Sequence, residues 1–466
     1  MSATQTKLDE AAVRELEASF GGQLVSADDP AYDEHRAVWN GSIDRFPSLI
    51  ARCAGVADVI AAVRFARRTG LRAAVRGGGH SFPGLSVCDG GVVIDLAPMK
   101  GIRVDPEART ARVQAGVLWG ELDRETQAFG LATTGGIVTH TGVAGLTLGG
   151  GIGWLQRKYG LTIDQLISAD LVTAEGEFLK ASESENPDLF WGLRGGGGNF
   201  GIVTEFEFRL HPVGPIVHAG PVFWPIEKSP EVLRFYRDWI AEAPDELMTI
   251  VNHRKAPALP FVPQELHGEL VVVVASCYAG PVEEAEKVVA PLKAFGSPVL
   301  DVCEAKPYLQ HQAMFDPSFP HGWWYYIRAC DVAELTDDVI DITVDHAMRI
   351  QSPQGGFPIW QLGGAVARVG EDETAFNGRG AGHTFNISAV TEAAEGFEEE
   401  REWSRDFWSA LEPHHTSVYV NFLMEEGEER IREAYGAQKY DRLKALKRRY
   451  DPDNLFRLNQ NIPPDG

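Results

Sequence analysis

Apolar and polar positions alternate along the chain with two different periods, which predict helices and strands in turn. In residues 55–70, apolar side chains recur at positions 56, 59, 60 and 63, the spacing of one helix face, and Gly70 ends the pattern. Short apolar runs between such segments are typical of buried strands. Over the first 130 residues the predicted helices are 8–20, 55–70 and 118–129, the last striped by Leu118, Leu122 and Phe129, and the predicted strands are 71–75, 91–96 and 110–114. This alternation indicates α+β or α/β layers.

The later part of the chain shows longer apolar runs with a period of two. The predicted strands are 202–208, 269–277, 323–329 and 357–369, and a helix is predicted over 283–292. In the last of these strands, Pro358, Trp360 and Leu362 share one face. We therefore expect an antiparallel sheet backed by helices in the region 214–413.

Three glycine clusters interrupt these patterns, at 76–84 (RGGGHSFPG), 133–160 and 195–201. Consecutive glycines after a strand let a ligand approach the backbone closely, and the N–H groups of such a loop bind anions such as phosphate. One extended ligand that is touched along its length explains three clusters better than three unrelated turns. His80 ends the first loop and would lie beside this ligand; a solvated loop histidine is the alternative.

A Rossmann-type dinucleotide fold is the competing interpretation of the second cluster, because Asp170 follows GGGIG at about twenty residues. The glycine spacing of that motif is not met, and no clear buried strand precedes it. The chain also lacks GxxxxGK[ST], which excludes a P-loop.

Composition limits the binding partners, the location and the metal sites that we expect for this protein. The net charge of −23, from 43 basic and 66 acidic residues, argues against nucleic acid or an anionic membrane surface. No run of about 18 apolar residues occurs, so no membrane span is expected. The five cysteines are scattered without a CxxC pair, and no signal-peptide pattern is evident, so we expect a cytoplasmic protein. No metal site is expected, since His414 and His415 are adjacent and no HExxH motif exists.

Four motifs in order carry a resemblance to a known family. RGGGHSFPG, GVAGLTLGGGIGWLQRKYGL, NPDLFWGLRGGGGNFGIVTEFEF and KRRYDPDNLFRLNQNIPP resemble the FAD-linked oxidases of the vanillyl-alcohol oxidase superfamily, in the berberine-bridge-enzyme-like branch. The resemblance implies an α+β fold with a two-domain FAD-binding architecture. It places the first part of the FAD-binding domain at 1–213, the antiparallel-sheet substrate domain at 214–413, and a C-terminal segment that returns to the FAD-binding domain at 414–466.

The resemblance also implies which residues hold FAD. The imidazole of His80 would be bonded covalently to the 8α-methyl carbon of the flavin. Many relatives tether the flavin a second time through a cysteine, but Val138 stands at that position, so a single attachment is expected. Thr141 falls where the family controls oxygen access. The full set of expected cofactor-binding residues is His80, Arg76, Gly77, Gly78, Gly79, Ser81, Gly84, Val138, Thr141, Gly142, Gly145, Gly149, Gly153, Ile202, Val203 and Asn459.

The expected catalytic residues are Trp360, Tyr419 and Asn421, again by resemblance. Several relatives carry a tyrosine base where this chain has Phe422, which accepts no proton. Tyr419 and Asn421 would face the flavin if Val420 and Phe422 do not. Other candidate proton acceptors are Tyr326, His383 and His140. A neutral amine substrate needs little help from a base, because it gives up hydride directly.

The expected function is that of a covalent-flavin oxidase. Its small organic substrate, an alcohol or an amine such as a secondary metabolite, would give hydride to flavin N5, and dioxygen would be reduced to hydrogen peroxide. A flavin dehydrogenase that ignores oxygen and a non-catalytic flavin- or nucleotide-binding protein, which should show no open pocket, are the alternatives. The sequence does not indicate the substrate, the catalytic base or the oligomeric state.

Overall fold

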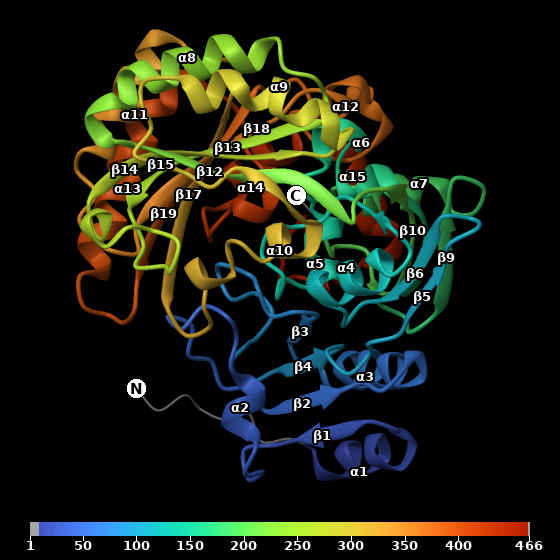
Figure 1. Ribbon diagram of the computed structural model, residues 1–466. Helices are drawn as coiled ribbons and strands as arrows, with labels where there is room; N and C mark the ends of the chain where they lie inside the picture. Colours follow the sequence, from blue (N-terminus) through green and yellow to red (C-terminus); the bar gives the residue numbers. More distant parts are fainter. Residues whose placement is uncertain (1–8, 465–466) are drawn as a thin grey trace.

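The computed structural model describes residues 9–464, which form three main sheets with helices packed around them (Figure 1). The first sheet has the order β1-β2-β4-β3 and lies at the lower end in that view. Its strands are β1 (Gln23–Val25), β2 (Leu49–Arg52), β3 (Ala73–Arg76) and β4 (Val92–Asp95). β2, β4 and β3 are parallel, so the loop that leaves β3 at Arg76 emerges from one edge of this sheet.

Helix α3 (Val56–Thr69) connects β2 to β3, as its apolar spacing predicts. Gly70 ends the helix in the left-handed region, with φ of 66°, where glycine carries no steric cost. The side chains of Val59, Val63 and Phe65 are buried against the sheet. Helix α1 (Glu10–Ser19) packs on α3, and α2 is Tyr32–Arg36.

The second sheet is antiparallel, with the order β5-β6-β10-β8-β9. Its strands are β5 (Ile102–Asp105), β6 (Thr110–Gln114), β8 (Leu166–Val172), β9 (Phe178–Ser182) and β10 (Ile202–Arg209). The neighbouring short elements are α4 (Trp119–Gln127), β7 (Leu131–Ala132), α5 (Val143–Leu148), α6 (Gln156–Tyr159), α7 (Pro187–Leu193) and β11 (His211–Pro212). The apolar residues of the first two sheets share one core, which explains why they form a single lobe.

The third sheet is large and entirely antiparallel, as predicted for the region 214–413. The strands are β12 (Ile216–Pro225), β13 (Leu247–Lys255), β14 (Leu270–Tyr278), β15 (Leu300–Asp301), β16 (Glu304–Pro307), β17 (Trp324–Val332), β18 (Gly356–Gln361), β19 (His383–Thr391) and β20 (His415–Ser417). The helices α8 (Ser229–Ala241), α9 (Val282–Ala294), α11 (Asp337–Ala347) and α13 (Phe397–Leu411) cover its outer face (Figure 1). The short α10 (Tyr308–Gln312) lies near α4.

Side-chain alternation divides the residues of this sheet between two faces. On β18, Phe357 and Ile359 pack into the core beneath the helices, whereas Trp360 belongs to a separate cluster on the opposite face. On β19, Phe385 and Ile387 likewise face the helices. The intervening residues therefore face the first lobe.

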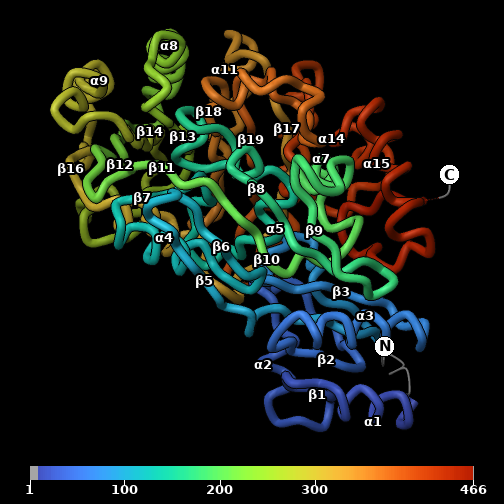
Figure 2. Tube along the Cα trace, turned by 90° about the vertical axis from the view of Figure 1, so that its right-hand side faces the viewer, coloured from blue at the N-terminus to red at the C-terminus, as the bar shows by residue number. Residues whose placement is uncertain are grey.

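The C-terminal segment returns to the first lobe. Figure 2 shows α14 (Glu428–Tyr435) and α15 (Ala437–Tyr450) at the same side of the molecule as α7. Arg442 of α15 lies over the ring of Trp191, with 3.8 Å between the guanidinium carbon and the ring centroid. Tyr435, Tyr440 and Leu443 belong to the core of the first lobe. The exact boundaries at 213/214 and 413/414 stay predictions.

Two predicted elements were wrong in detail. The strand predicted over 357–369 ends at Gln361, because Gly363 and Gly364 take positive φ of 84° and 56° and turn the chain into α12 (Ala365–Arg368). Phe129 does not belong to the apolar stripe of its helix. Helix α4 ends at Gln127, and Phe129 is 51% exposed. Within residues 9–464, no helix is long and apolar enough to cross a membrane.

Candidate active site

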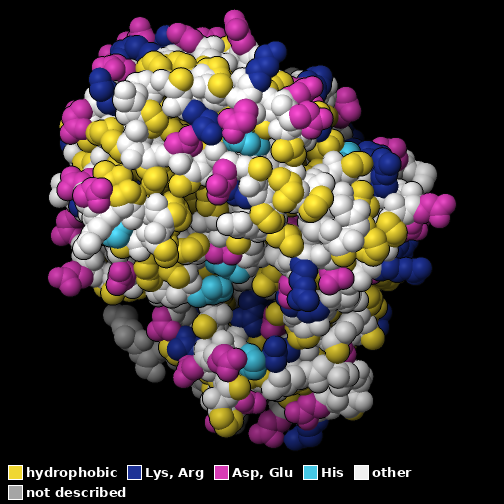
Figure 3. Space-filling model, viewed as in Figure 1, with side chains coloured by type: hydrophobic (Ala, Val, Ile, Leu, Met, Phe, Trp, Pro, Cys, Tyr) yellow, Lys and Arg dark blue, Asp and Glu magenta, His cyan; other side chains and the backbone are white. Residues whose placement is uncertain are grey.

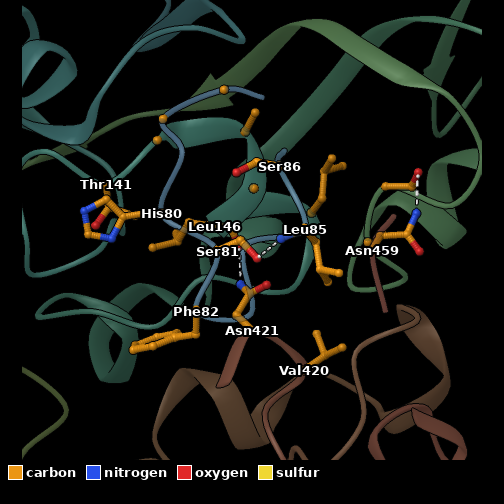
Figure 4. A pocket seen from close by; sticks show the side chains of 18 of the residues that line it. His80, Ser81, Phe82, Leu85, Ser86, Thr141, Leu146, Val420, Asn421 and Asn459 are labelled. Carbon is orange, nitrogen blue, oxygen red and sulfur yellow. Dashed lines mark hydrogen bonds between the residues drawn. The ribbon is translucent and has the colours of Figure 1, made fainter. Parts of the chain in front are cut away.

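A cavity of about 350 Å³ lies where the two lobes and the C-terminal segment meet. Figure 4 shows it as an elongated space, with His80 and Thr141 at one end of the view and Asn459 at the other. Residues from all three glycine clusters line it, together with residues of β13, β18 and β19 and of the segment 419–423. The structure thus brings together motifs that are far apart in the sequence.

The first glycine loop lines the cavity with bare backbone. The N–H groups from Gly77 to Ser81 have no acceptor among the described residues, although they are half-buried or buried. At Gly78 the loop touches the backbone of the second cluster, since an added Cβ would lie 2.5 Å from the Gly142 nitrogen. Unpaired N–H groups in a concave loop are suited to binding a phosphate group.

Two further glycines leave room above the backbone. An added Cβ at Gly145 or Gly198 meets no atom within 4 Å, and both residues line the cavity. A side chain at either position would stand in space that a ligand can fill. The other lining residues that we expected to bind the cofactor are Gly77, Gly79, His80, Ser81, Val138, Thr141, Gly142, Ile202, Val203 and Asn459.

Four expected cofactor residues do not line the cavity. Arg76 forms a buried ion pair with Asp95, with 2.8 Å between Nη2 and Oδ2. Gly84 is packed against Ile43, where an added Cβ would come within 2.6 Å of a methyl group. At Gly149 and Gly153 an added Cβ would collide with the Asn421 amide and with the Gly135 carbonyl. These residues shape the loops around the cavity instead of lining it.

His80 is held by aromatic and imidazole neighbours from three segments. The ring of Trp39 stacks on it, with 4.4 Å between centroids, and Trp39 stacks in turn on Tyr325 at 3.8 Å. His80 Nε2 lies 2.7 Å from His140 Nδ1. Burial, reinforced by His140 and His321, holds the pKa of His80 well below its usual range. The imidazole is therefore neutral at pH 7.

The segment that carries Trp39 joins the two lobes beside His80. The amide of Gly41 donates to the Trp323 carbonyl at 2.8 Å, and Gly322 N–H donates to the Trp39 carbonyl at 3.0 Å. Asn40 bonds the backbone of Tyr325 twice, through Nδ2 at 2.9 Å and Oδ1 at 3.1 Å. The stacked ring that supports His80 thus belongs to the contact between the lobes.

Three histidines that are remote in sequence meet at this end of the cavity. Ring nitrogens of His80, His140 and His321 all lie within 4.8 Å of one another. Figure 3 shows histidine side chains gathered at the surface between the upper and lower parts of the molecule. We expected no metal site from the sequence, and this group is the one arrangement within residues 9–464 that offers three such ligands.

The opposite end of the cavity is built from the third glycine cluster and the C-terminal segment. Asn459 donates from Nδ2 to the Gly198 carbonyl at 3.2 Å, and Ile202 and Val203, which follow this cluster at the start of β10, also line the cavity. Asn459 Oδ1 is buried without a hydrogen-bond partner among the described residues. Gln460 also lines this end. An unpaired acceptor here could bind an N–H or O–H group of a ligand.

One face of the large sheet closes over the cavity. The register pairs Asn252 of β13 with Pro358 of β18, and the pairing of β18 with β19 sets Asn386 opposite Pro358. Trp360 lines the cavity as expected, together with Phe315 and Phe319. Asn252 Oδ1 and Trp360 Nε1 are buried and have no partner within the described chain. This face therefore offers Asn252 Oδ1 as a buried free acceptor and Trp360 Nε1 as a buried free donor.

Tyr419 and Asn421 line the cavity, but not by strand alternation. Val420–Phe422 is a 3-10 turn, and every residue from Tyr419 to Leu423 lines the cavity. The Tyr419 hydroxyl accepts hydrogen bonds from Gly151 N–H at 3.0 Å and from Asn421 Nδ2 at 2.8 Å. Burial nevertheless raises the pKa of Tyr419 to about 12, so the phenol stays protonated at pH 7. This environment does not favour Tyr419 as a base.

Of the other three candidate bases, two lie away from the cavity and one contacts His80. The Tyr326 hydroxyl accepts from Arg328 and Arg405 on the far side of the large sheet, and His383 is enclosed in that sheet. Neither lines the cavity, and only His140 joins the site. Four residues of the site were not predicted from the sequence, because no motif marks them. Strand register places Asn252 and Asn386 there, and loops carry Trp39 and His321 to it.

The cavity fits a long ligand with phosphate groups and an aromatic ring system. The residues 77–81 present free N–H groups, Gly145 and Gly198 leave open space, and aromatic side chains gather at the His80 end. FAD has these chemical parts. Among residues 9–464, no aspartate, glutamate, lysine or arginine side chain lines the cavity.

Comparisons with known proteins agree with this geometry. Residues 47–182 match the "FAD binding domain" family, and residues 418–463 match the "Berberine and berberine like" family. An FAD-linked oxidoreductase of Dictyostelium discoideum is 34% identical, over 91% of each chain. The (R)-6-hydroxynicotine oxidase of Paenarthrobacter nicotinovorans is 32% identical, over 96% of this chain and 98% of that one.

Solved structures show the same architecture. The crystal structure of 6-hydroxy-D-nicotine oxidase from Arthrobacter nicotinovorans superimposes with a TM-score of 0.88 and 32% identity, covering 98% of this chain and 100% of that chain. A berberine-bridge-enzyme-like protein from Physcomitrella patens gives a TM-score of 0.88 at 24% identity, over 97% and 99% of the two chains. At that lower identity the likeness concerns the fold alone.

Proposed function

The chain belongs to the FAD-linked oxidoreductases of the vanillyl-alcohol oxidase superfamily that carry a berberine-like C-terminal segment, and we propose that it oxidises an amine carbon of a small uncharged substrate. Bound FAD supplies the hydride acceptor, and dioxygen then takes up the electrons to give hydrogen peroxide. The observation that carries the proposal is the continuous cavity, which has bare backbone on one wall and an uncharged sheet face on the other.

The backbone wall holds the cofactor in this proposal. The N–H groups of 77–81 bind the pyrophosphate, and Gly142 and Gly145 let the cofactor lie against the chain. Asn459 binds at the opposite end from His80. His80 carries the flavin covalently, and it does so alone, because Val138 lines the cavity where a second tether would need a thiol.

The sheet face selects the substrate. Since no charged side chain of the described chain lies on the cavity wall, an ionised substrate would lose hydration without gaining a partner. Asn252 Oδ1 and Trp360 Nε1 are suited to one donor and one acceptor on the substrate, and Phe315 and Phe319 are suited to an apolar or aromatic body. The substrate class is thus a neutral, largely apolar amine with one or two polar groups.

Among the described residues, no base is poised on the cavity wall, and this favours an amine over an alcohol. An alcohol must lose its O–H proton as hydride leaves, whereas a neutral amine retains its nitrogen lone pair to drive hydride out. Tyr419 has its pKa raised to about 12, and no carboxylate lines the cavity within the described chain. The similarity to (R)-6-hydroxynicotine oxidase supports the same choice.

The two alternative functions make different predictions. The open cavity argues against a non-catalytic flavin-binding protein, which should show no pocket over the flavin. A dehydrogenase would be reduced by substrate in the same way but would react slowly with dioxygen. Cytoplasmic location remains a prediction.

A matched substrate panel tests the proposal. Purified protein is mixed in air with neutral cyclic amines, with the corresponding alcohols and with oligosaccharides, and peroxide release and flavin bleaching are recorded together. Peroxide from amines alone is expected. Bleaching without peroxide would identify a dehydrogenase, and turnover of alcohols or oligosaccharides in preference to amines would contradict the substrate class.

The covalent link is tested separately by acid precipitation. We expect the pellet of the unaltered protein to stay yellow and that of His80→Ala to lose its colour, with the mass of the intact chain falling by one FAD. Release of all flavin from the unaltered protein by acid would contradict the tether but would leave the oxidase proposal standing.

A further inference from the structure

His140 has no part in the function proposed so far, yet within the part of the chain that the structure describes it makes the one hydrogen bond to the His80 ring. Its Nδ1 lies 2.7 Å from His80 Nε2. Within residues 9–464, His80 Nδ1 makes no hydrogen bond. One nitrogen of His80 is therefore engaged by a second imidazole while the other remains available.

The surroundings fix this pair in place. Trp39 stacks on the His80 ring at an interplanar angle of 18°, so the ring does not rotate freely about its last bond. Next to His140, Thr139 donates to Asp316 from its backbone N–H at 2.8 Å and from its hydroxyl at 2.5 Å. The Asp316 carboxylate thus anchors the loop that carries His140, from the opposite lobe.

The three imidazoles form a path from the cavity to solvent. His80 lines the cavity, His140 is half-buried, and His321 is exposed with its ring centroid 4.9 Å from that of His140. A metal ion is less consistent with the geometry. Two imidazole nitrogens bound to one zinc ion at about 2.0–2.1 Å would be roughly 3.3 Å apart, whereas a separation of 2.7 Å is that of a hydrogen bond.

We propose that His140 is the proton acceptor that activates His80 for covalent attachment of the flavin, and that His321 passes the proton to solvent. This inference rests on the proposed function, in which His80 carries the flavin. In the productive tautomer, His80 Nε2–H donates to His140 Nδ1, and the lone pair of His80 Nδ1 is free to attack.

The chemistry balances with dioxygen as the oxidant. A bond forms between His80 Nδ1 and the 8α carbon of the flavin, while one C–H bond of that methyl group and the His80 Nε2–H bond break. The two electrons remain on the flavin until dioxygen accepts them and, with two protons, becomes hydrogen peroxide. Loss of the Nε2 proton to His140 keeps the alkylated imidazole uncharged.

The charges around His140 agree with this role. Burial, with His321 beside it, lowers the pKa of His140, whereas Asp316 acts to raise it. His140 is thus neutral at pH 7 and able to accept a proton, and the nearby carboxylate stabilises the imidazolium that results.

The test follows attachment instead of turnover. Protein with unattached FAD is incubated in air, and the covalent share is measured over time by in-gel flavin fluorescence and intact mass. We expect His140→Ala to bind FAD but to form the covalent link about 10²-fold more slowly, the usual contribution of one acid–base group. Added imidazole should restore part of the rate in His140→Ala but not in His140→Gln, which leaves no space for it.

Controls distinguish the role of His140 from the proposed covalent tether at His80. His267→Ala, in a loop that does not line the cavity, should attach flavin at the unaltered rate, and a chelator should change nothing. Attachment at the full rate in His140→Ala would overturn the role of His140 while leaving the tether intact. Loss of all FAD binding in that variant would also overturn it, as would a rate that depends on added zinc. Acid-labile flavin in the unaltered protein would instead refute the tether itself.

Discussion

One wall of the cavity consists mainly of backbone, and the opposite wall consists of side chains. The cofactor wall consists of loops in which glycines let the backbone approach closely, as at Gly78 and Gly142. The opposite wall consists of side chains on β13, β18 and β19, set side by side by the strand register. The first wall comes from contiguous sequence motifs. The second depends on the register of β13 with β18, which lies about a hundred residues later, and of β18 with β19.

This difference indicates which wall determines specificity for the cofactor and which determines specificity for the substrate. A backbone wall recognises what every member of a cofactor class shares, namely phosphate charge and a planar ring. A side-chain wall can change its hydrogen-bonding pattern by single substitutions without disturbing the fold. Variants on the two walls should therefore have separable effects.

The largest effect is expected from substitution of Gly78 in the cofactor wall. In Gly78→Ala the new Cβ would lie 2.6 Å from Gly142 Cα, so the loops must move apart. We expect a loss of about 1–3 kcal/mol in the free energy of unfolding, together with loss of bound FAD. Gly145→Ala is the matched control, since its Cβ meets no protein atom. It should leave apoprotein stability unchanged in urea unfolding and lower only FAD affinity; equal destabilisation by both variants would contradict this.

A buried histidine within the large sheet should make the stability of the protein depend on pH. Burial lowers the pKa of His383 to about 4, and neither of its ring nitrogens has a partner within the described chain. The unfolded chain, with a pKa of about 6.5, binds the proton first as pH falls, so stability is lost between pH 6.5 and 4. Relative to the unaltered protein, His383→Phe should gain about 2 kcal/mol between pH 7.5 and pH 5. A difference in urea unfolding that is the same at both pH values would contradict this.

The smallest expected effect concerns substrate recognition. Asn252→Leu removes the unpaired acceptor without touching the glycine loops. With the preferred amine, KM should rise about tenfold, equivalent to one hydrogen bond, while FAD content and kcat stay close to the unaltered values. Flavin loss in this variant would show that the two walls are not independent.

Much of the cofactor wall could be predicted from the sequence, because glycine clusters act through local backbone geometry. His80, Gly142 and Asn459 were all placed at the cavity by motif. Arg76 was misplaced although it adjoins the same motif, because its guanidinium is taken up by Asp95, whose position depends on the pairing of β3 with β4.

The substrate wall could be predicted only in outline. A period of two put Trp360 on the correct face, but Asn252 and Asn386 join it through strand register, which no local pattern encodes. The turn at Val420–Phe422 had the apolar content of a strand, and its geometry follows from packing against the cavity. His321 reaches His140 from a loop of the other lobe, a tertiary contact without a sequence signal.

The contact between the lobes at Trp39 limits how far the two lobes can move relative to each other. Residues 39–41 are bonded to 322–325 across the junction, and the same tryptophan supports the ring of His80. Separation of the lobes would pull this support away from His80, where we propose that the flavin is attached. We therefore expect substrate and product to pass by side-chain and loop motion while the lobes stay together, so entry should be selective for size even before any contact with Asn252 is made.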